Sequence, residues 1–320
     1  MAEAVHDDEP QNVTFESDKV EDPLYSALLA NAIFNGFFCY TTIMLNIVTI
    51  YALRKTSSLP NTLKTLLLNL AVADLGIGFL GQPLEVVYLT ELLRWNRSSP
   101  ATVQISAVVL SVFYLSSLCS IMAISADRFI AIQMPLRYED LVTRRRVVAV
   151  IITIWLFSTL ISPCSVFLLT TNTAFAFLVI VESIFFLAAT LLYYKIYLTI
   201  RRHKEQIQSQ MQQLAENNDL ANSTRITKSA NSTFCIYLLF WVCYLPHLFV
   251  SIARRIHGNE NVIIKVLYVF SETPVLVNSS LNLLSRLLLE NETDSTHNIG
   301  HSSKTISRFY QSLKSVVLLV

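Results

Sequence analysis

Residues 125–138 read SADRFIAIQMPLRY, which places an acid and a base, Asp127 and Arg128, at the end of a long uncharged run. A charged side chain at the centre of a bilayer costs about 2.5–3.5 kcal/mol on insertion scales, so a charged pair is expected at the end of a span. Pro135 and then three consecutive arginines, at 144–146, follow the pair. Basic residues gather in the cytoplasmic connections of membrane proteins. The stretch therefore predicts the cytoplasmic end of a membrane-spanning helix.

Apolar runs of similar length lie on both sides of this stretch. Of the 320 residues, 53% are hydrophobic and only 15% are charged, a composition typical of a membrane protein. Each run can cross a hydrocarbon core of about 30 Å as a helix, and the alternating pattern of barrel strands is missing. We therefore expect an all-α membrane protein, a bundle of seven helices with spans at 27–53, 62–88, 102–133, 146–169, 174–201, 229–253 and 261–289.

The distribution of Lys and Arg predicts the orientation of the bundle. The connections that include 54–64, 137–146 and 201–228 hold more basic residues than the connections on the opposite side, which places them in the cytoplasm. The N-terminus is then outside and the C-terminus inside, as in a multi-pass protein of the plasma membrane.

The two ends of the chain lack the apolar runs. Residues 1–26 are acidic and predict an extracellular disordered tail, while 290–320 predict a cytoplasmic tail. Asn12 and Asn96 begin glycosylation sequons on the outer side. Similar triplets in a predicted cytoplasmic loop make this pattern weak evidence of glycosylation.

The deepest acid is Asp74, in the sequence LNLAVADL of the second span. Other spans offer polar side chains at a matching depth, which would make a pocket for a small cation and a few waters. A plain hydrogen-bonded network between helices, worth about 0.6 kcal/mol per contact, is an equally good interpretation at this point. The candidate partners of Asp74 are Asn46, Ser117, Asn278 and Asn282.

Several short motifs occur in one order and at one spacing along the chain. They are Leu70, Ala73 and Asp74 in the second span, the Asp–Arg–aromatic triplet 127–129, Trp155 in the fourth span, Tyr193 in the fifth, and FWVCYLP at 240–246 in the sixth. Each is weak alone, but as a set they are specific. With them the chain resembles a rhodopsin-like (class A) G-protein-coupled receptor, from about residue 28 to residue 282.

The resemblance implies an activation switch on the cytoplasmic side. Asp127 would hold Arg128 at rest, and Arg128 would swing inward, helped by Tyr193, when the sixth helix moves out. The proline of the sixth span removes a backbone hydrogen bond and would allow a kink there. The implied switch residues are Asp127, Arg128, Tyr193, Phe240, Cys243, Tyr244 and Pro246.

The resemblance also implies partners and an ion. A heterotrimeric G protein would dock on the cytoplasmic face, arrestin would be a further partner, and the pocket at Asp74 would hold an allosteric sodium ion, with no other cofactor. The docking residues would be Arg128, Pro135, Leu136, Arg144, Arg145 and Arg146, and the sodium pocket would comprise Asn46, Asp74, Ser117, Asn278 and Asn282.

The sequence departs from the family pattern at several positions. Tyr244 stands where the family usually has tryptophan, and Leu283 and Arg286 replace the proline and tyrosine of the seventh-span motif. Val103 replaces the cysteine that usually fastens the second outer loop, and Phe185 replaces the usual proline of the fifth span. The last two departures, with a very short second outer loop, resemble the melanocortin and adenosine branch.

The outer half of the bundle is the expected ligand site. Leu110 occupies the position of the aspartate that binds biogenic amines in related receptors, which counts against such amines. The remaining polar side chains would favour a cationic or hydrogen-bonding ligand, a small molecule or a peptide, if they face one cavity. Rim residues that reach water are the competing interpretation. The predicted ligand-binding residues are Glu85, Leu110, Glu182, His247 and Glu272.

Three further classes of function can be compared with a signalling receptor. A channel or transporter would explain buried acids, but the chain has no internal repeat and only six glycines. A receptor fold without G-protein output, such as a decoy or ligand sink, stays open because of Leu283 and Arg286. An enzyme is not supported, since the hydrolase, zinc-protease and phosphate-loop motifs are missing. The net charge of +1 argues against a nucleic-acid partner.

Overall fold

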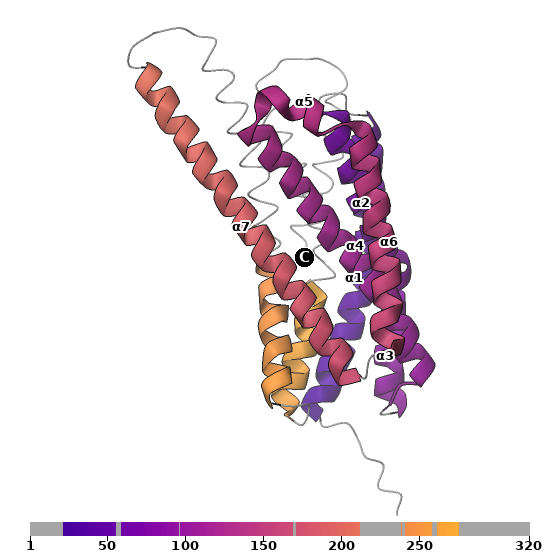
Figure 1. The fold of residues 1–320 in the computed structure, drawn as a ribbon. Coiled ribbons are helices and arrows are strands. Elements are labelled where there is room, and N and C mark those ends of the chain that lie inside the picture. The colour runs from indigo at the N-terminus through magenta and orange to yellow at the C-terminus, as the bar shows by residue number, and fades with distance from the viewer. Residues whose placement is uncertain are drawn as a thin grey trace, which may run out of the picture.

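The computed structural model is a bundle of long helices whose axes run side by side (Figure 1). It describes residues 22–55, 59–95, 97–168, 171–211, 238, 241–257 and 261–274. The elements are α1 (Asp22–Lys55), α2 (Asn61–Gly76), the π-helical turn η1 (Ile77–Gly81), α3 (Gln82–Trp95), α4 (Pro100–Gln133), the 3-10 turn η2 (Pro135–Arg137), α5 (Tyr138–Leu141), α6 (Arg144–Leu168) and α7 (Thr171–Met211), followed by helices at 241–257 and 262–274.

The described residues of the predicted spans are helical, except residue 261, which precedes the last helix. Five helices are long and apolar enough to cross a membrane, and the described parts of the sixth and seventh predicted spans are helical as well. The bounds differ at the ends, because α1 begins at Asp22 and the sixth helix extends to residue 257. The five candidate spans are Leu24–Lys55, Asn61–Trp95, Pro100–Gln133, Arg144–Leu168 and Ala176–Thr199.

The fifth predicted span is longer than expected. The helix α7 runs from Thr171 to Met211, ten residues past the expected bound of 201, and its apolar candidate span is Ala176–Thr199.

The sequence suggested one regular helix for the second span, but the structure divides this span into two α-helices. The π-helical turn Ile77–Gly81 separates α2 from α3. Pro83 follows directly and has no backbone N–H, so the carbonyl of Phe79, four residues earlier, cannot receive its usual α-helical bond. A widened turn before a proline is a known response to this loss. It changes the direction in which the α3 side chains point relative to those of α2.

The core on the cytoplasmic side joins α2, α4 and α6. Leu66, Leu70 and Leu118 are almost fully buried there. Asn69 donates to the Ser120 hydroxyl at 2.7 Å and accepts a hydrogen bond from Trp155 Nε1 at 2.8 Å. Polar ties of this kind fix the rotation of neighbouring helices in a membrane, where apolar contacts alone do not distinguish lipid from protein.

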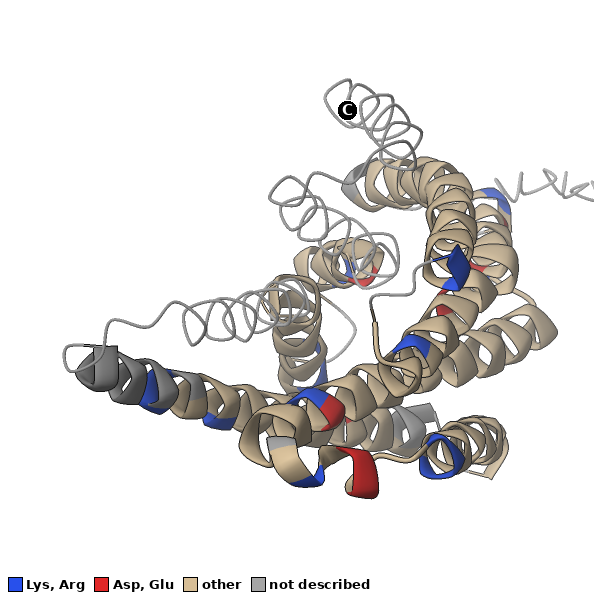
Figure 2. Ribbon diagram, turned by 90° about the horizontal axis from the view of Figure 1, so that it is seen from above, with Lys and Arg blue, Asp and Glu red and all other residues tan. Residues whose placement is uncertain are grey.

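The two ends of the bundle carry different groups of predicted site residues. The end that carries α5 is uppermost in Figure 1, and it contains the cytoplasmic connections predicted from the Lys and Arg distribution. Viewed from that end, Lys and Arg positions are spread over several of the helices (Figure 2). The pair Asp127 and Arg128, predicted as part of a switch, lies at this end, and the predicted ligand residues lie toward the other.

Candidate functional site

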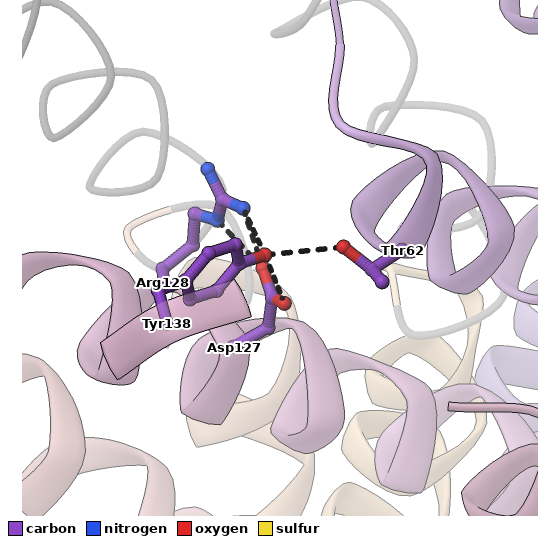
Figure 3. A network of polar contacts seen from close by, with 4 residues as sticks. All are labelled: Thr62, Asp127, Arg128 and Tyr138. Atoms are coloured by element: carbon purple, nitrogen blue, oxygen red, sulfur yellow. Dashed lines mark hydrogen bonds and ion pairs between the residues drawn. The ribbon is translucent and has the colours of Figure 1, made fainter. Parts of the chain in front are cut away.

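The Asp127–Arg128 pair at the cytoplasmic end of α4 is closed (Figure 3). Arg128 Nε donates to Asp127 Oδ2 at 2.9 Å, and Nη2 donates to the same oxygen. The side chains of Asp127 and Arg128 are only 3% and 13% exposed, so both charges are largely removed from water. Pairing offsets the desolvation cost that either charge would carry alone. The pair expected from the sequence is present, and its role as a switch stays a prediction.

A tyrosine that sequence reasoning missed holds the other oxygen of Asp127. The hydroxyl of Tyr138, the first residue of α5, donates to Asp127 Oδ1 at 2.8 Å. The Thr62 hydroxyl lies 3.1 Å from the Tyr138 hydroxyl (Figure 3). Burial raises the pKa of Tyr138, so this hydroxyl remains a donor at physiological pH. The Tyr138 hydroxyl thus joins α2, α4 and α5. No spacing in the sequence signals it, because Tyr138 belongs to a short loop helix.

The other described switch residues lie in the core. Tyr193 of α7 is buried, and its hydroxyl is 3.1 Å from that of Ser125, one turn before Arg128 on α4. Tyr244 is buried against Tyr114, with ring centroids 5.6 Å apart, and Cys243 is buried beside it. Pro246 lies on the exposed side of the same helix, and Phe240 lies outside the described residues.

The predicted docking residues divide into two groups. Leu136 in η2 is 98% exposed, and Arg144 and Arg145 at the start of α6 are exposed too. Arg146 makes hydrogen bonds to the backbone of α5: its Nη1 donates to the carbonyls of Asp140 and Leu141 at 3.0 and 2.9 Å. It therefore fastens α5, the helix that carries Tyr138, to α6. Pro135 is the first residue of η2.

The predicted ion pocket is partly described. Asp74 is 1% exposed, and the Ser117 hydroxyl donates to its Oδ1 at 3.1 Å. Asn46 is buried, with its Nδ2 donating to the Thr42 carbonyl on its own helix. A buried carboxylate beside a hydroxyl oxygen fits a small hard cation, which prefers oxygen ligands. Asn278 and Asn282 lie outside the described residues, so this assignment stays a prediction.

In the outer half, two predicted ligand residues meet. Glu182 of α7 is 6% exposed, and its Oε2 is 4.0 Å from His247 Nε2. The other ring nitrogen of His247 is 3.3 Å from the Ser271 hydroxyl, and the Ser251 hydroxyl is 3.4 Å from Nε2. His247 therefore connects its own helix, 241–257, to α7 and to the helix at 262–274.

Two further acids face each other nearby. Glu85 of α3 and Glu272 are close enough to interact electrostatically, and Glu272 also interacts with Tyr268 and Arg254. The Arg254 guanidinium lies 4.2 Å from the centroid of the Tyr268 ring. That ring is 5.6 Å from the ring of His247, so it links this acidic pair to the Glu182 side. Four of the five predicted ligand residues thus belong to one connected cluster.

The fifth predicted ligand residue has a packing contact. A Cβ added at Gly81 would lie 2.8 Å from Leu110 Cδ2, so Leu110 packs closely on the π-helical turn. The two predicted glycosylation sites, Asn12 and Asn96, lie outside the described residues. Among the residues that the structure describes, no group of three or more His, Cys, Asp or Glu side chains could hold a metal ion.

Comparisons with known proteins agree with this architecture. The family model described as 7 transmembrane receptor (rhodopsin family) matches residues 45–282. The adenosine receptor A2b of Gallus gallus is 34% identical over 113 residues, which cover 35% of this chain and 32% of that receptor. The histamine H1 receptor of Homo sapiens is 31% identical over 123 residues, which cover 38% of this chain and 24% of that receptor. The matches thus span a third or less of these relatives. The family match covers most of the chain, from the last third of α1 onward, and establishes that the protein belongs to the rhodopsin family of seven-transmembrane receptors.

Proposed function

We propose that this chain is a ligand-activated receptor that activates a heterotrimeric G protein through outward movement of its sixth helix. A ligand bound in the outer half would bind the open form better than the closed form and so shift the population between them. The observation that supports this most is the closed network of Asp127, Arg128 and Tyr138 at the cytoplasmic end. The proposed ligand site is the cluster of Glu85, Glu182, His247 and Glu272.

The network is suited to hold a resting state. Hydrogen bonds to charged groups are each worth about 1.5–3 kcal/mol, so the bonds to Asp127 can hold Arg128 away from a docking partner. They also connect α4 to α5 and to Thr62 of α2, so they resist rearrangement of this end of the bundle. Leu136, Arg144 and Arg145 stand exposed beside the network, where a partner can reach them.

Replacing Tyr138 by phenylalanine tests the proposal without a known ligand. Tyr138→Phe removes the hydroxyl that donates to Asp127 and keeps the ring. The resting state should lose about 1.5–3 kcal/mol, which raises ligand-independent nucleotide exchange roughly tenfold if the active state is a minor one. The measurement is the rate of guanine-nucleotide exchange by purified G proteins with the receptor in lipid nanodiscs.

Tyr51→Phe is the matched control, because Tyr51 of α1 is 67% exposed and lies far from this network in the sequence. It should leave the exchange rate unchanged. If no G protein responds to the parent or to Tyr138→Phe, the proposal of G-protein output is wrong.

The ion pocket gives a second expected result. Sodium chloride should raise the melting temperature of the receptor more than potassium chloride does, because an ion that binds only the folded state stabilises it. Asp74→Asn should remove this sodium-specific difference, since it removes the one charge at the site. Asp140→Asn, an exposed position on α5, is the control and should retain it. An equal sodium effect in Asp74→Asn and the parent would exclude Asp74 as the ion ligand.

The second candidate function is a receptor without G-protein output. The observation that favours it is the replacement of the usual seventh-span proline and tyrosine by Leu283 and Arg286, residues that lie outside the described part of the chain. Such a protein would bind its ligand as a decoy or sink. Ligand binding with no nucleotide exchange by any G protein class would favour this function.

A further inference from the structure

The acids of the outer half share one depth in the bundle. Glu85 stands ten residues before the end of α3, His247 ten before the end of its helix, Glu272 ten after the start of its helix, and Glu182 eleven after the start of α7. At 1.5 Å per residue, each lies about 15 Å from the outer helix end. The four side chains therefore lie at a similar distance from the outer ends of their helices, in the outer half of the bundle.

The charges of this layer are not balanced within the described residues. Arg254 interacts electrostatically with Glu272 and lies over the ring of Tyr268, so it offsets the negative charge of Glu272. The charge that acts on Glu85 is another carboxylate, that of Glu272. The outer half of α4 carries no charged residue, since Asp127 and Arg128 at its inner end are the only ones on that helix. Glu85 and Glu182 are thus two buried acids without a fixed cation.

Buried polar atoms beside these acids also lack partners. Gln82, Glu85 and Leu89 are the buried residues of α3 and recur at helical spacing, so they share its inward face. Gln82 is fully buried, and within the described part of the chain neither of its amide atoms has a hydrogen-bond partner. Glu182 Oε1 and the Tyr114 hydroxyl are buried as well, and these two side chains interact with each other. Buried polar groups in native proteins are nearly always satisfied, so the Gln82 amide is suited to bind a polar molecule.

The two unpaired acids belong to one connected region. Glu182 is 4.0 Å from His247, whose ring stacks near that of Tyr268, and Tyr268 interacts with both Glu272 and Glu85. The rings of His247 and Tyr268 connect the two carboxylates, and the Arg254 guanidinium already lies over the Tyr268 ring. A ligand that reaches both Glu85 of α3 and Glu182 of α7 would meet a carboxylate at each end.

Building on the proposed receptor function, we propose that the ligand is dibasic, with one ammonium or guanidinium group at Glu85 and Gln82 and a second at Glu182 and Tyr114. A ligand with one charge would leave one buried carboxylate uncompensated, which is costly. The amide oxygen of Gln82 and the hydroxyl oxygen of Tyr114 would accept further hydrogen bonds from the two cationic groups. His247 and Tyr268 would line the space between them.

Binding can be measured on the receptor in nanodiscs without any G protein. The probes are straight-chain diamines of increasing length and monoamines of equal length, and the readout is the concentration dependence of the melting temperature. Because each charge-assisted contact is worth about tenfold to hundredfold in affinity, one length of diamine should bind at least tenfold tighter than its monoamine. E85Q and E182Q should each reduce diamine affinity to about that of the monoamine. E91Q, on the same helix as Glu85 but near its outer end, is the matched control and should bind like the parent.

The melting temperature without ligand is a second measurement, and it shows whether a variant is folded. Without ligand, E85Q should melt at or above the parent temperature, because it removes a buried charge whose electrostatic neighbour is another carboxylate. Equal affinity for diamines and monoamines, or sensitivity to only one of the two acids, would overturn the dibasic ligand. So would the absence of stabilisation by every diamine at millimolar concentration. Failure of G-protein exchange with intact diamine binding would instead overturn the proposed output and leave this inference standing.

Discussion

Arg128→Ala should abolish G-protein nucleotide exchange while the protein still reaches the cell surface in normal amount. The guanidinium is the one cation at the inner end of α4, and it is held beside exposed docking residues such as Leu136. Loss of a charge that completes a docking surface costs about 2–5 kcal/mol, so exchange should fall at least about thirtyfold. The loss should also occur in the Tyr138→Phe background, where exchange is raised. Nucleotide exchange in nanodiscs and surface labelling measure the two properties.

Removal of Arg128 has a structural consequence that must be separated from the functional one. Asp127 is buried and would keep Tyr138 as its hydrogen-bond donor, so the end of α4 retains one of its ties. Arg94→Ala, an exposed arginine at the outer end of α3, is the control and should leave exchange unchanged. Normal exchange in Arg128→Ala would show that the buried pair is structural only.

Gly76→Ala should lower the stability of the bundle by about 1–3 kcal/mol, the usual cost of overpacking a core. An added Cβ would lie 2.0 Å from the ring of Phe113, far inside contact distance. That ring cannot turn away freely, because it packs edge-on against Trp155 with centroids 6.0 Å apart. The helices α2 and α4 would therefore have to separate. The melting temperature of the receptor in nanodiscs measures the effect.

Gly36→Ala is a matched control within the same bundle. Nothing lies within 4 Å of a Cβ built at Gly36 on α1, so this variant should melt at or slightly above the parent temperature. The double variant Gly76→Ala, Phe113→Ala should recover part of the loss, because it makes room for the new methyl group. Equal melting temperatures for the two single variants would mean that α2 and α4 do not approach as closely as described.

Much of the candidate site could be predicted from the sequence, because a charge in an apolar run is visible without a structure. Asp127, Arg128 and Asp74 were found in this way, and so were Glu85 and Glu182. Their contacts were predicted less well. Tyr138 and Thr62, which complete the network at Asp127, carry no charge and follow no recognisable spacing. The hydrogen bonds of Arg146 to the backbone of α5 were not predicted either, and its place on the docking rim stays a prediction.

By itself, the sequence determined the order and approximate position of the apolar helices, because apolar length and a fixed rise of 1.5 Å per residue are local properties of the chain. It also determined which apolar runs carry an acid. Only the tertiary structure decided which groups meet: Glu182 with His247, Asn69 with Trp155, and Tyr138 with Asp127. These contacts depend on the rotation and register of separate helices, which are set by features such as the turn at Ile77–Gly81 and the close approach at Gly76. Packing between segments far apart in the chain fixes such features, and no local pattern encodes them.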